Sequence, residues 1–330
     1  MPTRITLVAA ALLLAQSGSA REDVKPAENF SAGLEAYEAS DYAKAAELLR
    51  VAAVRNPSNA EVHLLLAKTY YESEQRDAAI ASAERAVALE PQNSVYHEWL
   101  GRVYGDKADH AGPFAAMSLA KKAHREFERA VELDERNFSA RQALIEFDCS
   151  APGIVGGGED KARPHIEKIA SMDAAEGHYA EGNCRRQKKD FAAANVEFDK
   201  ALKSHPKSVD LIYDIGDYAM KHEQAETLAA VADEGETVSP GDPRGKFYRG
   251  VGLVLRNEHA EDAEKLLREY LKRAPKRSTF PSAWRTHEWL GRLYENQEKG
   301  DAAIQEYETT LQLEPKDKIA REALKRLKKG

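Results

Sequence analysis

The chain has 330 residues, of which 42% are hydrophobic and 31% are charged, and its formal net charge at pH 7 is −7. This composition is typical of a folded protein and excludes a disordered or low-complexity chain. The acidic balance also argues against nucleic acid as a partner, because binding to phosphates needs a basic surface.

The first twenty residues predict a secretory signal peptide. Arg4 supplies a positive charge, an apolar run follows at 5–15, and the small residues Gly18 and Ala20 precede Arg21 as they would before a cleavage site. A membrane anchor is the alternative, but the apolar run would cross only about half of a hydrocarbon core of ~30 Å. We therefore expect cleavage after Ala20, export to a Gram-negative periplasm, and no stable membrane insertion of the mature chain.

Turns that contain proline recur at a regular interval after the signal peptide. The sequences NPSN at 56–59, EPQN at 90–93 and HPKS at 205–208 share one form, and Pro57 and Pro91 lie 34 residues apart. Because proline cannot continue a helix, each of these turns marks the place where one helix ends and the next begins. The interval predicts a chain of similar helical units.

The first helix of each predicted unit carries a bulky residue, a leucine, a small residue and a tyrosine along one face. The segments HLLLAKTYY from His63, HEWLGRVYG from His97 and HEWLGRLYE from His287 place these types at i, i+3, i+4 and i+7. The second helix carries an alanine and a large apolar residue four positions later, as at Ala123 and Phe127. The small residues let two antiparallel helices approach closely. Since no unit buries its apolar face alone, the units must stack.

These spacings resemble the tetratricopeptide repeat family, whose signature W-x2-L-G-x2-Y…A-x3-F…P spans 34 residues. The resemblance implies an all-α fold, a right-handed superhelical solenoid of antiparallel helix pairs with about eight repeats and a C-terminal capping helix. The segment APGIVGG, which begins at Ala151, also resembles a variety of exported bacterial envelope repeat protein. The expected units lie near 26–59, 60–93, 94–137, 138–174, 175–208, 209–242, 243–277 and 284–317, followed by a cap at 318–330.

Two neighbouring units carry extra residues in the turn between their helices. The third unit has GDKADHAGPF at 105–114, and the fourth has SAPGIVGGGED at 150–160. Equivalent turns project from the same edge of a solenoid, so we expect the two insertions to meet in space. An anion site at the glycines of the second insertion is disfavoured, since the carboxylates of Glu159 and Asp160 follow them.

The titratable residues show no spacing that predicts catalysis, a metal site or a cofactor site. The segment HEWLG occurs twice but lacks the second histidine of the zinc-protease motif HExxH. The two cysteines, Cys149 and Cys184, fall near the ends of neighbouring first helices. A disulfide between them and a pair of buried free thiols are therefore both open.

The first helices of such repeats line a concave groove, and the positions not used for packing predict which side chains face it. These positions mix charges of both signs with tyrosines, which suits a protein or peptide ligand. The segment 179–217 is the preferred site, because it gathers several such residues over two consecutive units. The candidate binding residues are Lys68, Arg102, Glu146, Tyr179, Asn183, Arg186, Tyr213 and Asp217, and the last unit adds Glu288, Arg292 and Glu295.

The sequence thus predicts a non-enzymatic scaffold or adaptor of the cell envelope that binds a partner protein or peptide in its concave groove. The alternative is a module that binds a glycan or another small ligand in a pocket between the insertions at 105–114 and 150–160. An enzyme built on the repeat scaffold is a third possibility, which no residue spacing supports.

Overall fold

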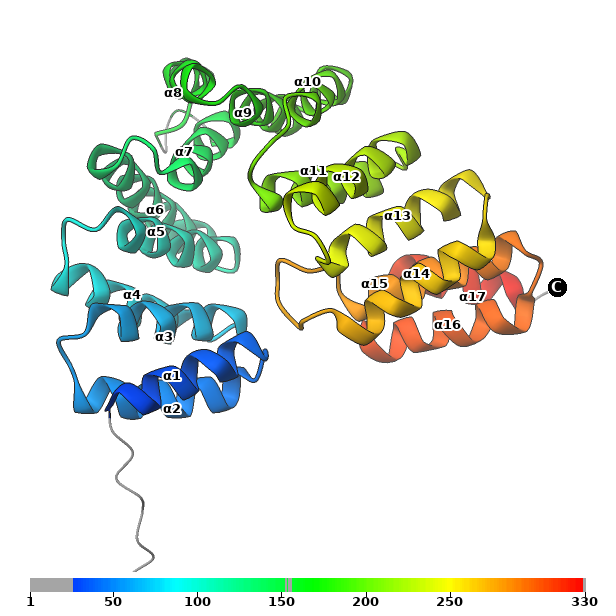
Figure 1. Ribbon diagram of the computed structural model, residues 1–330. Helices are drawn as coiled ribbons and strands as arrows, with labels where there is room; N and C mark the ends of the chain where they lie inside the picture. Colours follow the sequence, from blue (N-terminus) through cyan, green and yellow to red (C-terminus); the bar gives the residue numbers. More distant parts are fainter. Residues whose placement is uncertain (1–25, 152, 154–155, 329–330) are drawn as a thin grey trace, which may run out of the picture.

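The computed structural model describes residues 26–151, 153 and 156–328. All regular secondary structure in these ranges is α-helical, and the helices follow one another along a curved path (Figure 1). The expected all-α repeat solenoid is confirmed. The expected signal peptide at 1–20 lies outside the described residues, and so do Pro152, Ile154 and Val155 of the second insertion.

Along this path the helices form antiparallel pairs and a final single helix. The first helices of the pairs are α1 (Pro26–Glu38), α3 (Ala60–Glu72), α5 (Ser94–Asp109), α7 (Phe138–Ser150), α9 (Ala174–Gln187), α11 (Val209–Lys221), α13 (Pro243–Arg256) and α15 (Ala283–Asn296). The second helices are α2 (Tyr42–Arg55), α4 (Arg76–Leu89), α6 (Pro113–Leu133), α8 (Glu159–Met172), α10 (Phe191–Lys203), α12 (Ala225–Val238), α14 (Ala260–Arg273) and α16 (Gly300–Leu313). The last helix is α17 (Lys318–Leu327).

The turns between pairs supply the caps that start the first helices. The side chain of Asn59 accepts a hydrogen bond from the Val62 backbone N–H at 3.2 Å, and Asn137 caps α7 in the same way. Ser208 does so at the start of α11. Each cap satisfies a backbone donor that has no partner within the helix, so the polar residue at the end of each turn fixes where the next helix begins.

In the third, fifth and eighth pairs, a glycine on the first helix faces a ring on the second. A β-carbon added at Gly101 would lie 2.6 Å from the Phe127 ring, and one added at Gly291 would lie 2.7 Å from the Tyr307 ring. The sixth pair has a different contact, because α12 has no aromatic residue. The ring that packs on Gly216 there belongs to Tyr248 of the next first helix, α13.

The insertion at 105–114 is not the loop that the sequence predicted. Residues 105–109 continue α5, and Pro113 begins α6, so only 110–112 lie outside the helices. Asp106 on the extension pairs with Arg76 of α4 at 2.9 Å, and Lys107 pairs with Asp77. These contacts hold the added turn against the preceding pair. The residues therefore mainly lengthen two helices. Lys107, His110 and Ala111 line a small cavity, but they share it with the start of α4 and not with the second insertion.

A disulfide joins Cys149 of α7 to Cys184 of α9, with the two Cα atoms 5.2 Å apart. Of the two states that the sequence left open, the structure has the bridged one. The bridge links the inner helices of the fourth and fifth pairs covalently.

The curved path also closes on itself. The connection between α14 and α15 reaches across to the first helices of the chain (Figure 1). The hydroxyl of Tyr42 donates to the carbonyl of Lys276 at 2.9 Å, and the guanidinium of Arg277 donates to the carbonyl of Glu38 at 3.0 Å. The backbone N–H of Ser278 donates to Glu72 at 2.9 Å. Segments that are far apart in the sequence thus meet and complete a ring.

Candidate functional site

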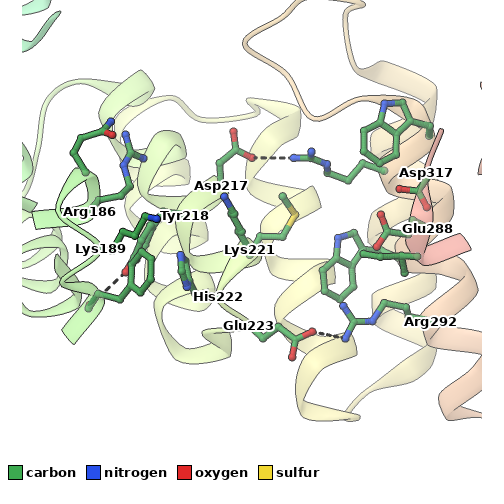
Figure 2. A pocket seen from close by; sticks show the side chains of 17 residues that line it. Arg186, Lys189, Asp217, Tyr218, Lys221, His222, Glu223, Glu288, Arg292 and Asp317 are labelled. Atoms are coloured by element: carbon green, nitrogen blue, oxygen red, sulfur yellow. Dashed lines mark hydrogen bonds and ion pairs between the residues drawn. The ribbon is translucent and has the colours of Figure 1, made fainter. Parts of the chain in front are cut away.

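The inner face of the curve carries the ends of several first helices. In Figure 1, α7, α9 and α11 lie inside α8, α10 and α12. A cavity of about 860 Å³ opens on this inner side between α9, α11, α15 and the start of α17, and Figure 2 shows the side chains that line it. Arg186 and Asp217 belong to its walls. The cavity is the candidate site, because it brings together first helices that are three units apart in sequence.

Four side chains beside this cavity form a polar network across three helices, and the sequence predicted three of them as groove residues. Arg186 of α9 lies 3.3 Å from the Asp214 carboxylate of α11 and 3.8 Å from the Glu146 carboxylate of α7. The Tyr179 hydroxyl donates to Asp214 at 2.8 Å. The network joins α7, α9 and α11 along the groove floor, and it leaves the Glu146 side chain half exposed.

The surroundings of this network shift the ionisation of its members. Burial raises the pKa of Tyr179 well above its ordinary value, and the Asp214 carboxylate raises it further. Burial also raises the pKa of Glu146, although Arg186 opposes that shift. For Arg186, burial lowers the pKa but the nearby Asp214, Tyr179 and Glu146 outweigh it and raise the pKa. At neutral pH the tyrosine is therefore a hydrogen-bond donor and the arginine is a fixed cation.

Two of the expected groove residues do not face an open surface. Tyr213 is 2% exposed, and its ring stacks on Tyr248 at 5.5 Å, with the Arg244 guanidinium 4.4 Å from its centroid. Asn183 is 4% exposed. Tyr213 was expected to face the groove, but its side chain is buried, because α13 packs against α11 and covers it. The accessible residues of the preferred segment are Tyr179, Arg186 and Asp217, of which Asp217 is the most exposed.

Lys68 and Arg102 lie in a separate cluster in the N-terminal half. The Lys68 ammonium and the Arg102 guanidinium lie 4.9 Å and 5.8 Å from the ring of Trp99. Tyr71 meets the same ring edge to face at 5.9 Å. These cation–π contacts bury much of Lys68, and burial lowers its pKa. The cluster is part of the inner face but not of the cavity.

Ion pairs link the two sides of the cavity. The Asp217 carboxylate accepts a hydrogen bond from the Tyr248 hydroxyl at 3.0 Å and lies 4.0 Å from the Arg285 guanidinium. Arg292 pairs with Glu223 at 2.7 Å, and Figure 2 draws both pairs as dashed lines. Because Asp217 lies on α11, Glu223 lies in the turn after it and both arginines lie on α15, the pairs connect the two walls of the cavity.

Several residues of the cavity wall were not predicted from the sequence. These are Lys189 and Lys221 on one side and Trp284 and Asp317 on the other. The repeat pattern could not place them, because they stand at helix ends and turns where the spacing carries no rule. Trp289 also lines the cavity, and the sequence could have indicated it, because it is the equivalent of Trp99 in the repeated segment HEWLGR.

The described residues contain no group of three or more side chains arranged to hold a metal ion. Nor does any described helix have the length and apolar character needed to cross a bilayer. The groove offers aromatic faces and paired charges, which are the elements of a binding surface.

The glycan-binding alternative required two adjoining loops. The first of them is helical, and within the described ranges no polar contact links it to the second.

Comparison with known proteins supports the repeat assignment. Two family models, both described as tetratricopeptide repeat, match residues 36–102 and 253–318. No curated protein matches the chain.

Similar solved structures are helical repeat proteins of low sequence identity. A thermophilic TPR protein from Thermus thermophilus has a TM-score of 0.46 and 19% identity, and the match covers 57% of this chain and 95% of that one. A tetratricopeptide repeat protein from Parabacteroides merdae has a TM-score of 0.43 and 11% identity, covering 92% and 98%. The C-terminal part of a TPR repeat-containing protein from Cytophaga hutchinsonii has a TM-score of 0.42 and 16% identity, covering 89% and 99%. Together with the fold, the two family matches support a tetratricopeptide repeat protein, an architecture that generally serves as a non-enzymatic scaffold for protein–protein interaction.

Proposed function

We propose that this protein is an exported adaptor of the cell envelope that binds a polypeptide segment of a partner in the cavity between α9, α11 and α15. The observation that carries the proposal is the composition of that cavity. Its walls hold Trp284, Arg186 and Arg292 together with carboxylates that fix the arginines. Tryptophan and arginine are the side chains that contribute most of the binding energy in protein interfaces.

The shape of the cavity favours a chain segment over a compact small molecule. Its volume of about 860 Å³ is near the upper end for small-ligand pockets, and its walls come from α9, α11, α15 and the start of α17. An extended segment could run from Arg186 on α9 to Arg292 on α15 and contact three first helices. The ion pairs across the groove keep this surface in one shape before binding, which lowers the entropic cost of association.

Two features support export. Residues 1–20 have the charge, apolar run and small residues of a signal peptide. The Cys149–Cys184 disulfide suits an oxidising compartment such as the periplasm, since disulfides are rare in reducing cytosol. Mass spectrometry of the protein from its native cells tests this part. We expect a mature N-terminus at Arg21 and no free thiol, whereas retention of residues 1–20 or two free thiols would contradict export.

Site-specific crosslinking in the native cells tests the binding site. A photoreactive phenylalanine derivative replaces Lys221, which is exposed at the cavity wall, and a matched control variant carries it at Lys265 on the outer helix α14. We expect one or a few protein adducts that form from position 221 and not from position 265. Adducts that are the same at both positions, or none at position 221, would contradict binding in the cavity.

A further inference from the structure

The sequence contains one hexapeptide twice, and the two copies provide an internal comparison. HEWLGR occurs at 97–102 on α5 and at 287–292 on α15. The histidines have equivalent partners, since His97 contacts Glu126 of α6 at 2.6 Å and His287 contacts Glu306 of α16 at 2.6 Å. The two copies therefore sit in the same way within their helix pairs.

The glutamates of the two copies are both buried, but only the first has partners. Glu98 is 7% exposed and accepts hydrogen bonds from Arg102 at 2.9 Å and from the Ser139 hydroxyl at 2.7 Å. Glu288 is 5% exposed, lines the cavity, and has no hydrogen bond or ion pair in the part of the chain that the structure describes. A buried carboxylate without a partner is costly, and a ligand cation at this place would remove that cost.

Two differences explain why Glu288 is left without a partner. The equivalent arginine, Arg292, turns away to Glu223 and lies 4.2 Å from the Trp289 ring. The helix that follows each copy's pair also differs. This helix is α7 after the first copy and α17 after the second, and they differ at the position of the donor to the glutamate. NFSARQAL at 137–144 aligns with DKIAREAL at 317–324, so Ile319 stands where the first copy has the donor Ser139.

The same alignment puts a second carboxylate beside the first. Asp317 occupies the place of Asn137, lines the cavity, and lies next to Glu288 in Figure 2. One oxygen of Asp317 caps α17 by accepting from the Ala320 N–H at 2.7 Å, which leaves the other oxygen for a ligand. The nearby cations are already engaged, because Arg292 is paired with Glu223 and Arg285 lies 4.0 Å from Asp217.

We propose that Glu288 and Asp317 form a receptor for a guanidinium or ammonium side chain of the polypeptide bound in the cavity, an inference that rests on the proposed function. Such a cation would supply the donors that Arg102 and Ser139 give to Glu98 in the first copy. On the opposite wall, Lys189 and Lys221 are exposed and have no ion pair among the described residues. An acidic residue of the same segment would face these lysines.

The ionisation of Glu288 agrees with this geometry. Burial, and after it the neighbouring Asp317, raise its pKa to about 7, while Arg292 and Arg285 oppose the shift. A bound cation would offset both the burial and the repulsion between the carboxylates.

Selection from a library of random dodecapeptides displayed on phage tests the proposal. The immobilised full-length mature protein is compared with Glu288→Gln and with Glu98→Gln, the matched change in the first copy. We expect the parent and Glu98→Gln to enrich peptides with lysine or arginine, and Glu288→Gln to lose that preference. Crosslinking to a photoreactive phenylalanine derivative in place of Phe191, which is exposed at the cavity wall, identifies the peptides that bind in the cavity.

The outcomes separate the two proposals. Peptides that crosslink in the cavity but show no preference for basic residues, or the same preference with Glu288→Gln, would overturn the cation receptor and leave the groove function standing. No enriched peptide at all would refute both.

Calorimetry with one selected synthetic peptide gives a second measurement. Replacing its basic residue by the neutral analogue citrulline or glutamine should weaken binding to the parent about tenfold, because a buried charged pair loses one partner. The double variant Asp317→Asn, Ile319→Ser removes the second carboxylate and gives Glu288 a hydroxyl donor at the place of Ser139, so it should bind the basic peptide about tenfold more weakly. Unchanged affinity in both experiments would contradict the receptor.

Discussion

The inner faces of α5 and α15 carry the same six residues in different surroundings. On α5 the glutamate is held by its own helix and by the next pair, and the tryptophan is covered by Lys68 and Arg102. On α15 the arginine bridges to the turn after α11, and a cavity opens over the glutamate. The comparison shows that identical motifs in a solenoid can have different roles. The residues across the groove and those of the next helix decide whether the motif is structural or available for a ligand.

Both copies share a glycine that packs on a ring of the second helix. Disrupting this packing should have the largest effect on the free energy of unfolding. Gly101→Val and Gly291→Val each force branched carbon atoms into a buried ring, Phe127 or Tyr307. We expect each change to lower the free energy of unfolding by about 3 kcal/mol, measured by urea denaturation followed by circular dichroism. A large loss in only one copy would show that the two pairs are not packed alike.

The two glutamates should respond to the same substitution with opposite signs. The pKa of Glu288 is raised from 4.5 to about 7, so the folded chain binds more protons than the unfolded chain between these values. Stability therefore falls as the pH rises through this window. Glu288→Gln should raise the free energy of unfolding by up to about 3 kcal/mol at about pH 8 and change it little at about pH 4.

Glu98→Gln is the matched control for that experiment. It weakens the charged hydrogen bonds from Arg102 and Ser139, so we expect stability at about pH 8 to fall by about 1 to 2 kcal/mol. Urea denaturation of both variants from about pH 4 to about pH 8 gives the comparison. Effects of the same sign would mean that the two carboxylates have equivalent surroundings after all.

Removing the donor from the first copy should make it resemble the second. Ser139→Ile deletes the hydroxyl that donates to Glu98 at 2.7 Å and leaves Arg102 as its remaining partner. We expect a loss of about 1 to 2 kcal/mol near neutral pH, measured in the same denaturation assay. Ser171→Ile, at an exposed site on α8, controls for the added side chain, and an equal loss there would contradict the assignment.

Opening the ring should have the smallest effect on stability. Arg277→Ala removes the hydrogen bond to the Glu38 carbonyl and the contact with the Tyr37 ring at 5.2 Å. Since the contact is at the surface, we expect a loss below about 1 kcal/mol. The hydrogen bonds of Tyr42 with Lys276 and of Ser278 with Glu72 remain, so we expect a small increase in the radius of gyration in X-ray scattering. The pH dependence due to Glu288 should persist, because its surroundings come from α11, α15 and α17. Loss of that dependence would mean that ring closure sets the difference between the copies.

The local structure of this protein could be predicted from its sequence. Asparagine or serine at the end of a turn caps the next helix, and small residues opposite rings set the spacing within a pair, as at Gly101 and Phe127. These are contacts between residues close in sequence, and they depend on helix periodicity and side-chain size alone. The same rules failed at 105–114, where pairing of Asp106 with Arg76 extends the helix beyond the expected turn.

The candidate site depended on the curvature of the whole array. Tyr213 fitted the groove pattern but is buried, because its ring stacks on Tyr248 of α13, which also packs on Gly216. Glu98 and Glu288 are indistinguishable within their hexapeptide. Glu223 and Ile319 distinguish them, and these residues reach the cavity only because α11, α15 and α17 converge there. Sequence periodicity fixes which face of a helix points inward, whereas the partners across the groove result from the small rotation between units summed over the solenoid.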